Sequence, residues 1–180
     1  MKGIILLANN FEDTEAIVTI DLLKRAGILI DTVSMYENLN VTSKYGLKLT
    51  CDKIIKDAKE QDYDFLVIPG GAAVMFHLEN EDTLNIVKEF ENSEKLIAAI
   101  CAAPSILGKL GLLDNQEFVC FPSFEEYMPN GIYVEQAKAL TSKNHITSKA
   151  AGTVFYFAYE IIKYLIDEPT AKKIFNEVYY

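Results

Sequence analysis

Short apolar, β-branched runs alternate along the chain with longer segments in which apolar residues recur at helical spacing. Four of these runs predict buried strands, at residues 4–8, 28–34, 64–68 and 96–100. Helical spacing predicts helices at residues 14–26, 82–90, 102–110 and 151–166, with a last helical segment from Pro169. This alternation is typical of a parallel sheet covered by helices on both faces.

Turn and capping residues indicate where several elements end. Gly27 follows the first helix at the position where a left-handed residue ends helices, and Asp13 or Thr14 is expected to cap its start. Residues 41–51 alternate around Gly46 as a small hairpin does. Further short strands are expected at residues 118–121, 132–136 and 145–148, and one or two helical turns at residues 54–58.

The chain of 180 residues is 50% hydrophobic and contains no internal repeat, linker or low-complexity segment. A chain of this length can bury about 70% of the surface that its unfolded form exposes, so it needs no metal or disulfide to build a core. We therefore expect a single domain over residues 1–180. Its predicted fold class is α/β, a flavodoxin-like three-layer sandwich with a mostly parallel sheet.

Charge and cysteine content narrow the possible partners and the compartment. Seventeen basic residues stand against 26 acidic ones, for a net charge of -9, which disfavours nucleic-acid binding. The first apolar run, residues 4–8, is too short for a secretory segment or a membrane span. Three cysteines without C-x-x-C spacing argue against a disulfide framework or a zinc site. We expect a cytoplasmic protein with no nucleic-acid or membrane partner and no metal.

Three loops should meet at one edge of the predicted sheet. In flavodoxin-like order the first strand neighbours the third and the third neighbours the fourth, and ligands bind beyond the carboxyl ends of these strands. The loops that leave those ends are residues 9–15, 69–73 and 101–104. The hypothesis of a functional site depends on this convergence more than on any one residue.

Cys101 lies between a predicted strand and a predicted helix, with Ala99 and Ala103 two residues to either side. Small residues at these positions are typical of a nucleophile elbow, a sharp strained turn that presents a reactive atom. Backbone N–H groups at the start of a helix favour the thiolate. The alternative is that Cys101 is a small buried apolar residue, which is the usual role of a free cysteine.

Residues of the other two loops could complete such a site. The backbone N–H groups of Gly71 and Ala102 would form an oxyanion hole beside Cys101, although glycines after a strand often serve only a turn. Glu15 should lean toward the sheet edge, although acids in a first helical turn are common because of the helix dipole. A carboxylate and a thiolate side by side raise each other's pKa, and a protonated Glu15 that donates to sulfur would resolve the conflict.

The two histidines, His77 and His145, complete no catalytic triad in this sequence. Each one alone is more often a surface or capping residue than a catalytic one. No pair of histidines or cysteines has the spacing of metal ligands.

Four segments together resemble the ThiJ/PfpI superfamily, in the branch that contains the parkinsonism-associated protein deglycase. They are NNFEDTEA, YDFLVIPGG, LIAAICAAPSIL and ITSKAAGTVFYFA, and the resemblance extends over residues 2–166. It implies a homodimer with a flavodoxin-like fold and a reactive cysteine at Cys101, touched by Glu15. It also implies backbone donors at Gly71 and Ala102.

This chain departs from the family pattern at three places. The deglycase branch has a histidine before a proline after the elbow helix, where this chain has Phe121. The protease-like branch has a histidine directly after the nucleophile, where this chain has Ala102, so peptidase activity is disfavoured. Class I glutamine amidotransferases need a late H-x-E, and here Thr147 stands two residues after His145.

Two functional hypotheses follow. The first is an enzyme, glyoxalase-III-like or deglycase-like, that uses Cys101 and Glu15 on small carbonyls such as methylglyoxal or on their adducts, without a cofactor. The second is a redox sensor or oxidative-stress protein whose Cys101 is oxidised. Phe121 would line the pocket. Cys120 would act as a resolving thiol, with a buried strand cysteine as the alternative.

Aromatic residues of the last long helix favour the homodimer. Phe155, Tyr156, Phe157 and Tyr159 lie on more than one face of this helix, which is more aromatic surface than one sheet contact requires.

Overall fold

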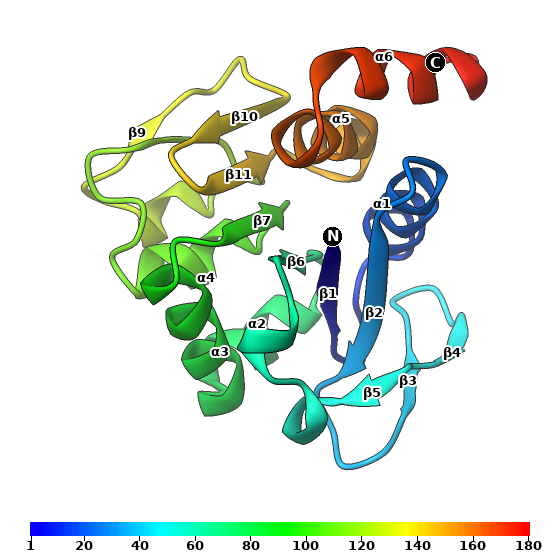
Figure 1. Ribbon diagram of the computed structural model, residues 1–180. Helices are drawn as coiled ribbons and strands as arrows, with labels where there is room; N and C mark the ends of the chain where they lie inside the picture. The colour runs from blue at the N-terminus through cyan, green and yellow to red at the C-terminus, as the bar shows by residue number, and fades with distance from the viewer.

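The computed structural model describes residues 1–180 and has a seven-stranded sheet at its centre (Figure 1). The strands lie in the order β10, β11, β7, β6, β1, β2 and β5. Their bounds are β1 Lys2–Leu7, β2 Leu29–Ser34, β5 Lys53–Ile54, β6 Phe65–Ile68, β7 Leu96–Ile100, β10 Ala139–Ser142 and β11 His145–Ser148. Every neighbouring pair is parallel except β10 with β11. The predicted adjacency of the first, third and fourth main strands is confirmed.

Helices cover both faces of this sheet, as the sequence pattern predicts (Figure 1). On one face lie α1 Asp13–Arg25 and α5 Val154–Leu165, with α6 Glu168–Glu177 packed on α5. On the other face lie α2 Ala73–Glu79, α3 Glu81–Asn92 and α4 Pro104–Lys109. The flavodoxin-like three-layer α/β fold is therefore confirmed.

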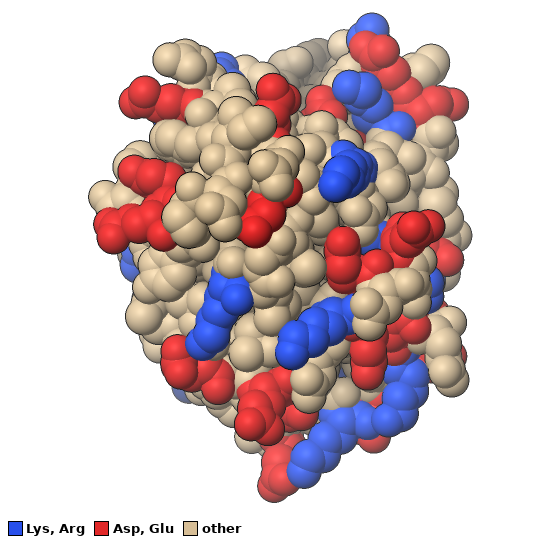
Figure 2. All heavy atoms as spheres, turned by 90° about the vertical axis from the view of Figure 1, so that its left-hand side faces the viewer, with Lys and Arg blue, Asp and Glu red and all other residues tan.

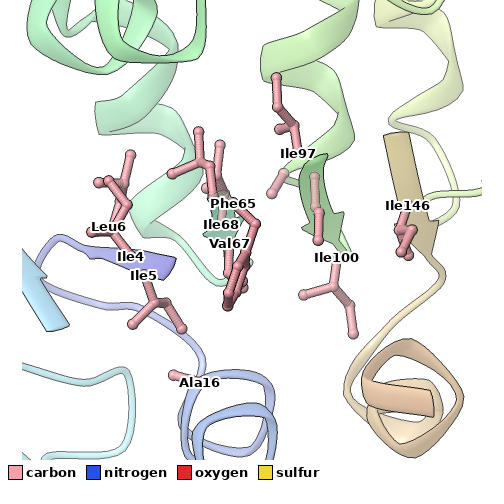
Figure 3. Close-up of a cluster of buried hydrophobic side chains, with 14 of the residues drawn as sticks. Ile4, Ile5, Leu6, Ala16, Phe65, Val67, Ile68, Ile97, Ile100 and Ile146 are labelled. Atoms are coloured by element: carbon pink, nitrogen blue, oxygen red, sulfur yellow. The ribbon is translucent and has the colours of Figure 1, made fainter. Parts of the chain in front are cut away.

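The central strands are apolar along their whole length because both faces of the sheet are covered. All residues of β6 and β7 are buried. Successive side chains point to opposite faces: Ile5 of β1 points toward Ala16 of α1, and Leu6 points to the other side (Figure 3). The resulting core holds 50 buried apolar residues in one cluster.

A glycine in β1 makes room for an aromatic ring of the neighbouring strand. Gly3 lies directly opposite Phe65 of β6, and the Phe65 ring occupies the place that a Gly3 side chain would take. The ring thus covers a strand position that has no side chain of its own to pack.

The residue that caps the start of α1 differs from the prediction. Glu12, rather than Asp13 or Thr14, caps the helix, and its carboxylate accepts the backbone N–H of Glu15 at 2.8 Å. Asp13 instead accepts a hydrogen bond from the hydroxyl of Ser43. Past the helix, Gly27 has a φ of 76°, as expected for a left-handed residue.

The region around residue 46 forms the expected hairpin. It consists of β3 Asn40–Thr42 and β4 Lys48–Thr50, which pair antiparallel. The segment at residues 54–58 contains a single 3₁₀ turn, Ile55–Asp57.

Short elements were the least accurately predicted. The strand expected at residues 118–121 is only β8 Glu117–Phe118, which pairs with β9 Ile132–Tyr133 in a separate two-stranded sheet. The sequence pattern also missed α2 and β10. Elements of this length carry too few residues for a periodic signal.

The aromatic side chains of α5 pack partly within the chain, and Tyr164 is 44% exposed. Phe157 is fully buried in the core. Phe155 and Tyr159 each meet the ring of Phe175 on α6, and Tyr180 stacks on Phe155 with ring centroids 4.5 Å apart. Phe155, Tyr156 and Tyr159 remain half-buried, so the inference that these rings favour a homodimer stays a prediction.

The molecular surface mixes charges of both signs. On the face drawn in Figure 2, basic side chains lie among acidic ones and form no continuous basic stripe. No helix combines the length and hydrophobicity that crossing a bilayer requires.

Substituting Gly3 should test the packing of β1 against β6. We expect Gly3→Ala to lower the free energy of unfolding by about 2 kcal/mol, because the new methyl group overlaps the Phe65 ring in a closed core. Urea denaturation measures the change. Gly152→Ala is the matched control, since a methyl group there meets no atom within 4 Å, and it should change stability by no more than about 0.5 kcal/mol. Equal effects of the two substitutions would contradict the proposed packing.

Candidate active site

The three loops at the carboxyl ends of β1, β6 and β7 meet, as the predicted strand order requires. Phe11 and Gly71 form an antiparallel bridge between the first two loops. The backbone N–H of Glu12 donates to the Gly70 carbonyl at 3.1 Å, and that of Ala73 donates to the Asn10 carbonyl at 3.3 Å. Backbone hydrogen bonds alone therefore hold the β1 and β6 loops together.

Gly70 and Gly71, which follow β6, are required because the three loops pack so closely together. A Cβ atom on Gly70 would lie 2.6 Å from Cβ of Cys101 and 2.7 Å from Oε2 of Glu15. Gly71 has a φ of 88°, and a Cβ there would lie 2.5 Å from the carbonyl oxygen of Asn10. Any side chain at Gly70 would have to displace the side chains of Cys101 and Glu15, and any side chain at Gly71 would have to displace the backbone of the first loop.

Cys101 occupies a strained turn between β7 and α4. Its φ of 65° lies in the left-handed region, which is rare for a side chain of this kind. The turn is held from both sides: the Cys101 N–H donates to the Ser148 carbonyl at 2.9 Å, and its carbonyl accepts from the Phe121 N–H at 2.8 Å. This is the geometry expected of a nucleophile elbow.

Two backbone N–H groups are directed at the sulfur of Cys101. They belong to Gly71 and Ala102, and their hydrogen bonds lower the pKa of the thiol. Burial and the nearby charge of Glu15 outweigh them and raise the pKa of Cys101 to about 12. The N–H groups at the start of the elbow helix therefore favour the thiolate, as expected from sequence, while burial and Glu15 act against it.

Glu15 lies beside this thiol and is only 1% exposed. Its Oε2 accepts the backbone N–H of Gly70 at 2.7 Å, its buried Oε1 has no hydrogen-bond partner, and the neighbouring Cys101 thiol lowers its pKa. Burial raises the pKa of Glu15 from 4.5 to about 7, against the opposing effect of the Gly70 hydrogen bond. At and below neutral pH a large fraction of Glu15 is therefore protonated and able to donate a hydrogen bond.

A cleft of about 380 Å³ opens over these groups. One wall comes from the β3–β4 hairpin, whose Lys44 and Tyr45 line the cleft. The hairpin is docked on α1 by Asp13, which accepts from the Ser43 hydroxyl and from the Tyr45 N–H. Sequence reasoning missed this wall, because the hairpin lies some 30 residues from α1 and has no chemical motif. The lining residues are Glu12, Glu15, Lys44, Tyr45, Gly71, Ala72, Cys101, Ala102, Phe121, Phe124, Ala150, Ala151 and Gly152.

Phe121 and Cys120 lie at different places relative to the cleft. Phe121 lines it and is 44% exposed. Cys120 is fully buried and does not line it, and burial raises the pKa of its thiol to about 12. All three cysteines are free thiols in this structure.

Both histidines lie away from the cleft, and the expectation that they are surface or capping residues was wrong. His77 is buried on α2, where its Nδ1 lies 3.0 Å from the Thr83 hydroxyl, and burial lowers its pKa to about 4. His145 is buried at the amino end of β11, with its Nε2 2.8 Å from Glu91. Because β11 runs parallel to β7, that end of the strand is opposite to Cys101.

The fold and the site define a class of protein: flavodoxin-like α/β proteins with a cysteine on a nucleophile elbow and a buried glutamate beside it. The profile of the DJ-1/PfpI family matches residues 1–164. The chain belongs to this family.

Several relatives match most of the chain. Protein DJ-1alpha of Drosophila melanogaster is 30% identical over 96% of this chain and 81% of its own length. A deglycase of Pyrococcus horikoshii is 28% identical over 92% of this chain and 99% of its own length. The chain spans only 40% of the length of DJ-1 homolog B of Arabidopsis thaliana, at 28% identity over 96% of this chain.

Solved structures agree with the fold at similar levels of identity. A variant of a DJ-1 superfamily protein from Salmonella typhimurium has a TM-score of 0.93 and 31% identity, covering 99% of this chain and 98% of the other. Oxidized DJ-1 from Toxoplasma gondii has a TM-score of 0.93 and 30% identity with the same coverage.

The protonation of Glu15 should be visible in the stability of the fold. The native protein keeps a proton on Glu15 that the unfolded chain loses between pH 4.5 and about 7. This group therefore makes the free energy of unfolding fall as the pH rises across that window, by on the order of 3 kcal/mol. Glu15→Gln stays neutral and retains an acceptor for Gly70, so it should exceed the wild type in stability by this order at pH 8 and match it near pH 4.5.

Urea denaturation of both proteins at pH 4.5, 6 and 8 measures this difference. Glu126→Gln is the control, because Glu126 is exposed and should show no such pH-dependent gain. A stability difference for Glu15→Gln that is the same at all three pH values would refute the raised pKa.

Proposed function

We propose that this protein is a cysteine-dependent enzyme that acts on small reactive carbonyl compounds or on their adducts with amines and thiols. The observation that carries the proposal is the contact of a buried Glu15 with Cys101, at a point toward which Gly71 and Ala102 direct backbone N–H groups. Deglycase-named relatives in the same family support the choice of carbonyl chemistry.

In the first step Cys101 attacks an aldehyde carbon. The new S–C bond displaces the carbonyl electron pair onto oxygen, and the N–H groups of Gly71 and Ala102 stabilise the oxyanion. The oxygen then takes up the proton that the thiol releases, transferred through Glu15. The product is a neutral hemithioacetal, so no free thiolate has to accumulate in the resting enzyme.

With a 2-oxoaldehyde such as methylglyoxal, an internal redox step follows. Glu15 removes the proton from the former aldehyde carbon and returns a proton to the adjacent carbon, while the hydroxyl proton passes from the oxygen of the first carbon to that of the second. The first carbon is thereby oxidised and the second reduced. The resulting thioester of a 2-hydroxy acid is hydrolysed by water, which regenerates the thiol. Methylglyoxal and one water thus become lactate without a cofactor.

No histidine lines the cleft, and this scheme therefore assigns all proton transfer to Glu15. Phe121 lies on the cleft wall at the position where the deglycase branch has a histidine, and an aromatic hydrocarbon moves no proton. A pKa of about 7 suits Glu15 to act as acid and as base near neutral pH.

Lactate formation from methylglyoxal tests the proposal. We expect turnover by the wild type, none by Cys101→Ala, and a loss of about 10²-fold or more in kcat for Glu15→Gln, which retains the hydrogen bond from Gly70 but transfers no proton. Cys51→Ala is the control, since Cys51 is buried outside the cleft. Lactate formed at an equal rate by Cys101→Ala would rule out the nucleophile.

A redox sensor is the second candidate, favoured by the oxidized state of the DJ-1 structure from Toxoplasma gondii. Peroxide would oxidise Cys101 to a sulfenic or sulfinic acid, whose oxygen would accept a hydrogen bond from protonated Glu15. Cys120 would then serve as resolving thiol only if local opening exposed it, because it is fully buried. No lactate together with ready oxidation of Cys101, read as added oxygen in the intact mass, would favour the sensor over the enzyme.

We also propose a homodimer, in line with the family resemblance. An apolar groove beside α1, lined in part by Ile17, Val18, Phe155 and Val178, is the surface that would accommodate a second copy. The monomer mass is 20.2 kDa, so light scattering at micromolar concentration should give about 40 kDa. A mass of about 20 kDa would reject the dimer.

A further inference from the structure

A row of three aromatic side chains extends from the Cys101 cleft onto the surface, and we propose that it binds an aryl group of the substrate. The preferred substrates are then aryl-substituted 2-oxoaldehydes rather than methylglyoxal. This inference deepens the proposed function, because it depends on the same nucleophile. The row consists of Phe121, Phe124 and Tyr127.

Local backbone geometry produces this row. The N–H of Phe124 donates to the Phe121 carbonyl at 3.1 Å, and the N–H of Tyr127 donates to the Phe124 carbonyl at 3.2 Å. Bonds from i+3 to i bring side chains three residues apart onto one line, as in a 3₁₀ helix. The centroids of Phe121 and Phe124 lie 6.4 Å apart, edge to face, and those of Phe124 and Tyr127 lie 5.8 Å apart, stacked at 16°.

The row is held in place at both ends. At the cleft end, the Phe121 N–H donates to the carbonyl of Cys101 at 2.8 Å, so the backbone that carries the first ring has a set position relative to the nucleophile. At the far end, Met128 is buried against α4, where Gly108 leaves no room for a side chain between them. A substrate ring would therefore meet a surface that needs little rearrangement.

The rings of this row are partly exposed to solvent and are not covered by the core. Phe121 is 44% exposed and Tyr127 is 39% exposed, while Phe124 is partly buried between them. Phe121 and Phe124 line the cleft, and eight of its thirteen lining residues are hydrophobic. Tyr45 of the β3–β4 hairpin also lines the cleft, with an aromatic ring that is 72% exposed.

The arrangement matches one chemical class of substrate. The carbonyl carbon must reach the sulfur of Cys101, and the substituent next to it then lies toward Phe121 and Phe124. A phenyl group there stacks on these rings and shields them from water, whereas the methyl group of methylglyoxal leaves them bare. The only cation of the lining, Lys44, belongs to the opposite wall, so the row itself contributes no charge.

The experiment compares alkylation of Cys101 by two α-bromoketones, phenacyl bromide and bromoacetone. In both reactions the sulfur forms a bond to the CH₂ carbon, bromide leaves and the thiol proton passes to solvent, so only the substituent on the ketone differs. The rate ratio of the two reagents is divided by the ratio for N-acetylcysteine, which removes their intrinsic reactivities. Peptide mapping confirms that Cys101 is the residue modified.

We expect a normalised ratio of about fivefold or more in favour of the aryl reagent for the wild type. Phe121→Ala and Tyr127→Ala should each lower this ratio, with the larger loss at Phe121. Tyr164→Ala is the matched control, an aromatic residue 44% exposed on α5, and should leave the ratio unchanged. Phe121→Leu, which retains bulk without the ring, covers the case that Phe121→Ala fails to fold.

A normalised ratio near one in the wild type would overturn the aryl subsite, even if methylglyoxal is turned over. A high ratio that survives in Phe121→Leu and Tyr127→Ala would overturn the assignment to this row. A high ratio lost in these variants, with no lactate formed from methylglyoxal and no mandelate from phenylglyoxal, would support the subsite and reject the proposed enzyme. Failure of the inference and of the proposed function are thus distinguishable.

Discussion

Two residues without side chains allow three chain segments to close on one point at the edge of the sheet. At Gly70 any side chain would overlap both Cys101 and Glu15, and at Gly71 it would overlap the backbone of the first loop. The close packing of the β1, β6 and β7 loops therefore depends on the strand order of the sheet and on these glycines together. The strand order brings the loops to the same edge, and the glycines remove the last steric obstacle.

The electrostatics of the site follow from this closeness. Loops packed so tightly exclude water from Glu15, and loss of hydration disfavours the charged form of the carboxyl group and of the thiol alike. Two N–H donors and a short helix at Cys101 do not outweigh that effect. With a pKa of about 7, Glu15 is divided between its protonated and charged forms near neutral pH, and its charged form raises the pKa of the Cys101 thiol further.

The remaining surface of the cleft comes from segments that have no role in the sheet. The β3–β4 hairpin supplies one wall through its attachment to Asp13 of α1, and residues 121–127 supply another through the hydrogen bond to the Cys101 carbonyl. Both segments lie outside the central sheet, although Val41 of the hairpin reaches the core and Phe124 packs against it.

The sequence by itself determined the architecture and the position of the site. Apolar periodicity is set by which faces of each element are buried, so strands such as β6 and helices such as α1 could be predicted, and the parallel order then placed Cys101, Gly71 and Glu15 at one edge. Only the tertiary structure decided the protonation of Glu15, the burial of His77 and His145, and the identity of the cleft walls. A pKa depends on desolvation, and the docking of Tyr45 or Phe121 depends on contacts between segments distant in sequence, neither of which leaves a periodic trace along the chain.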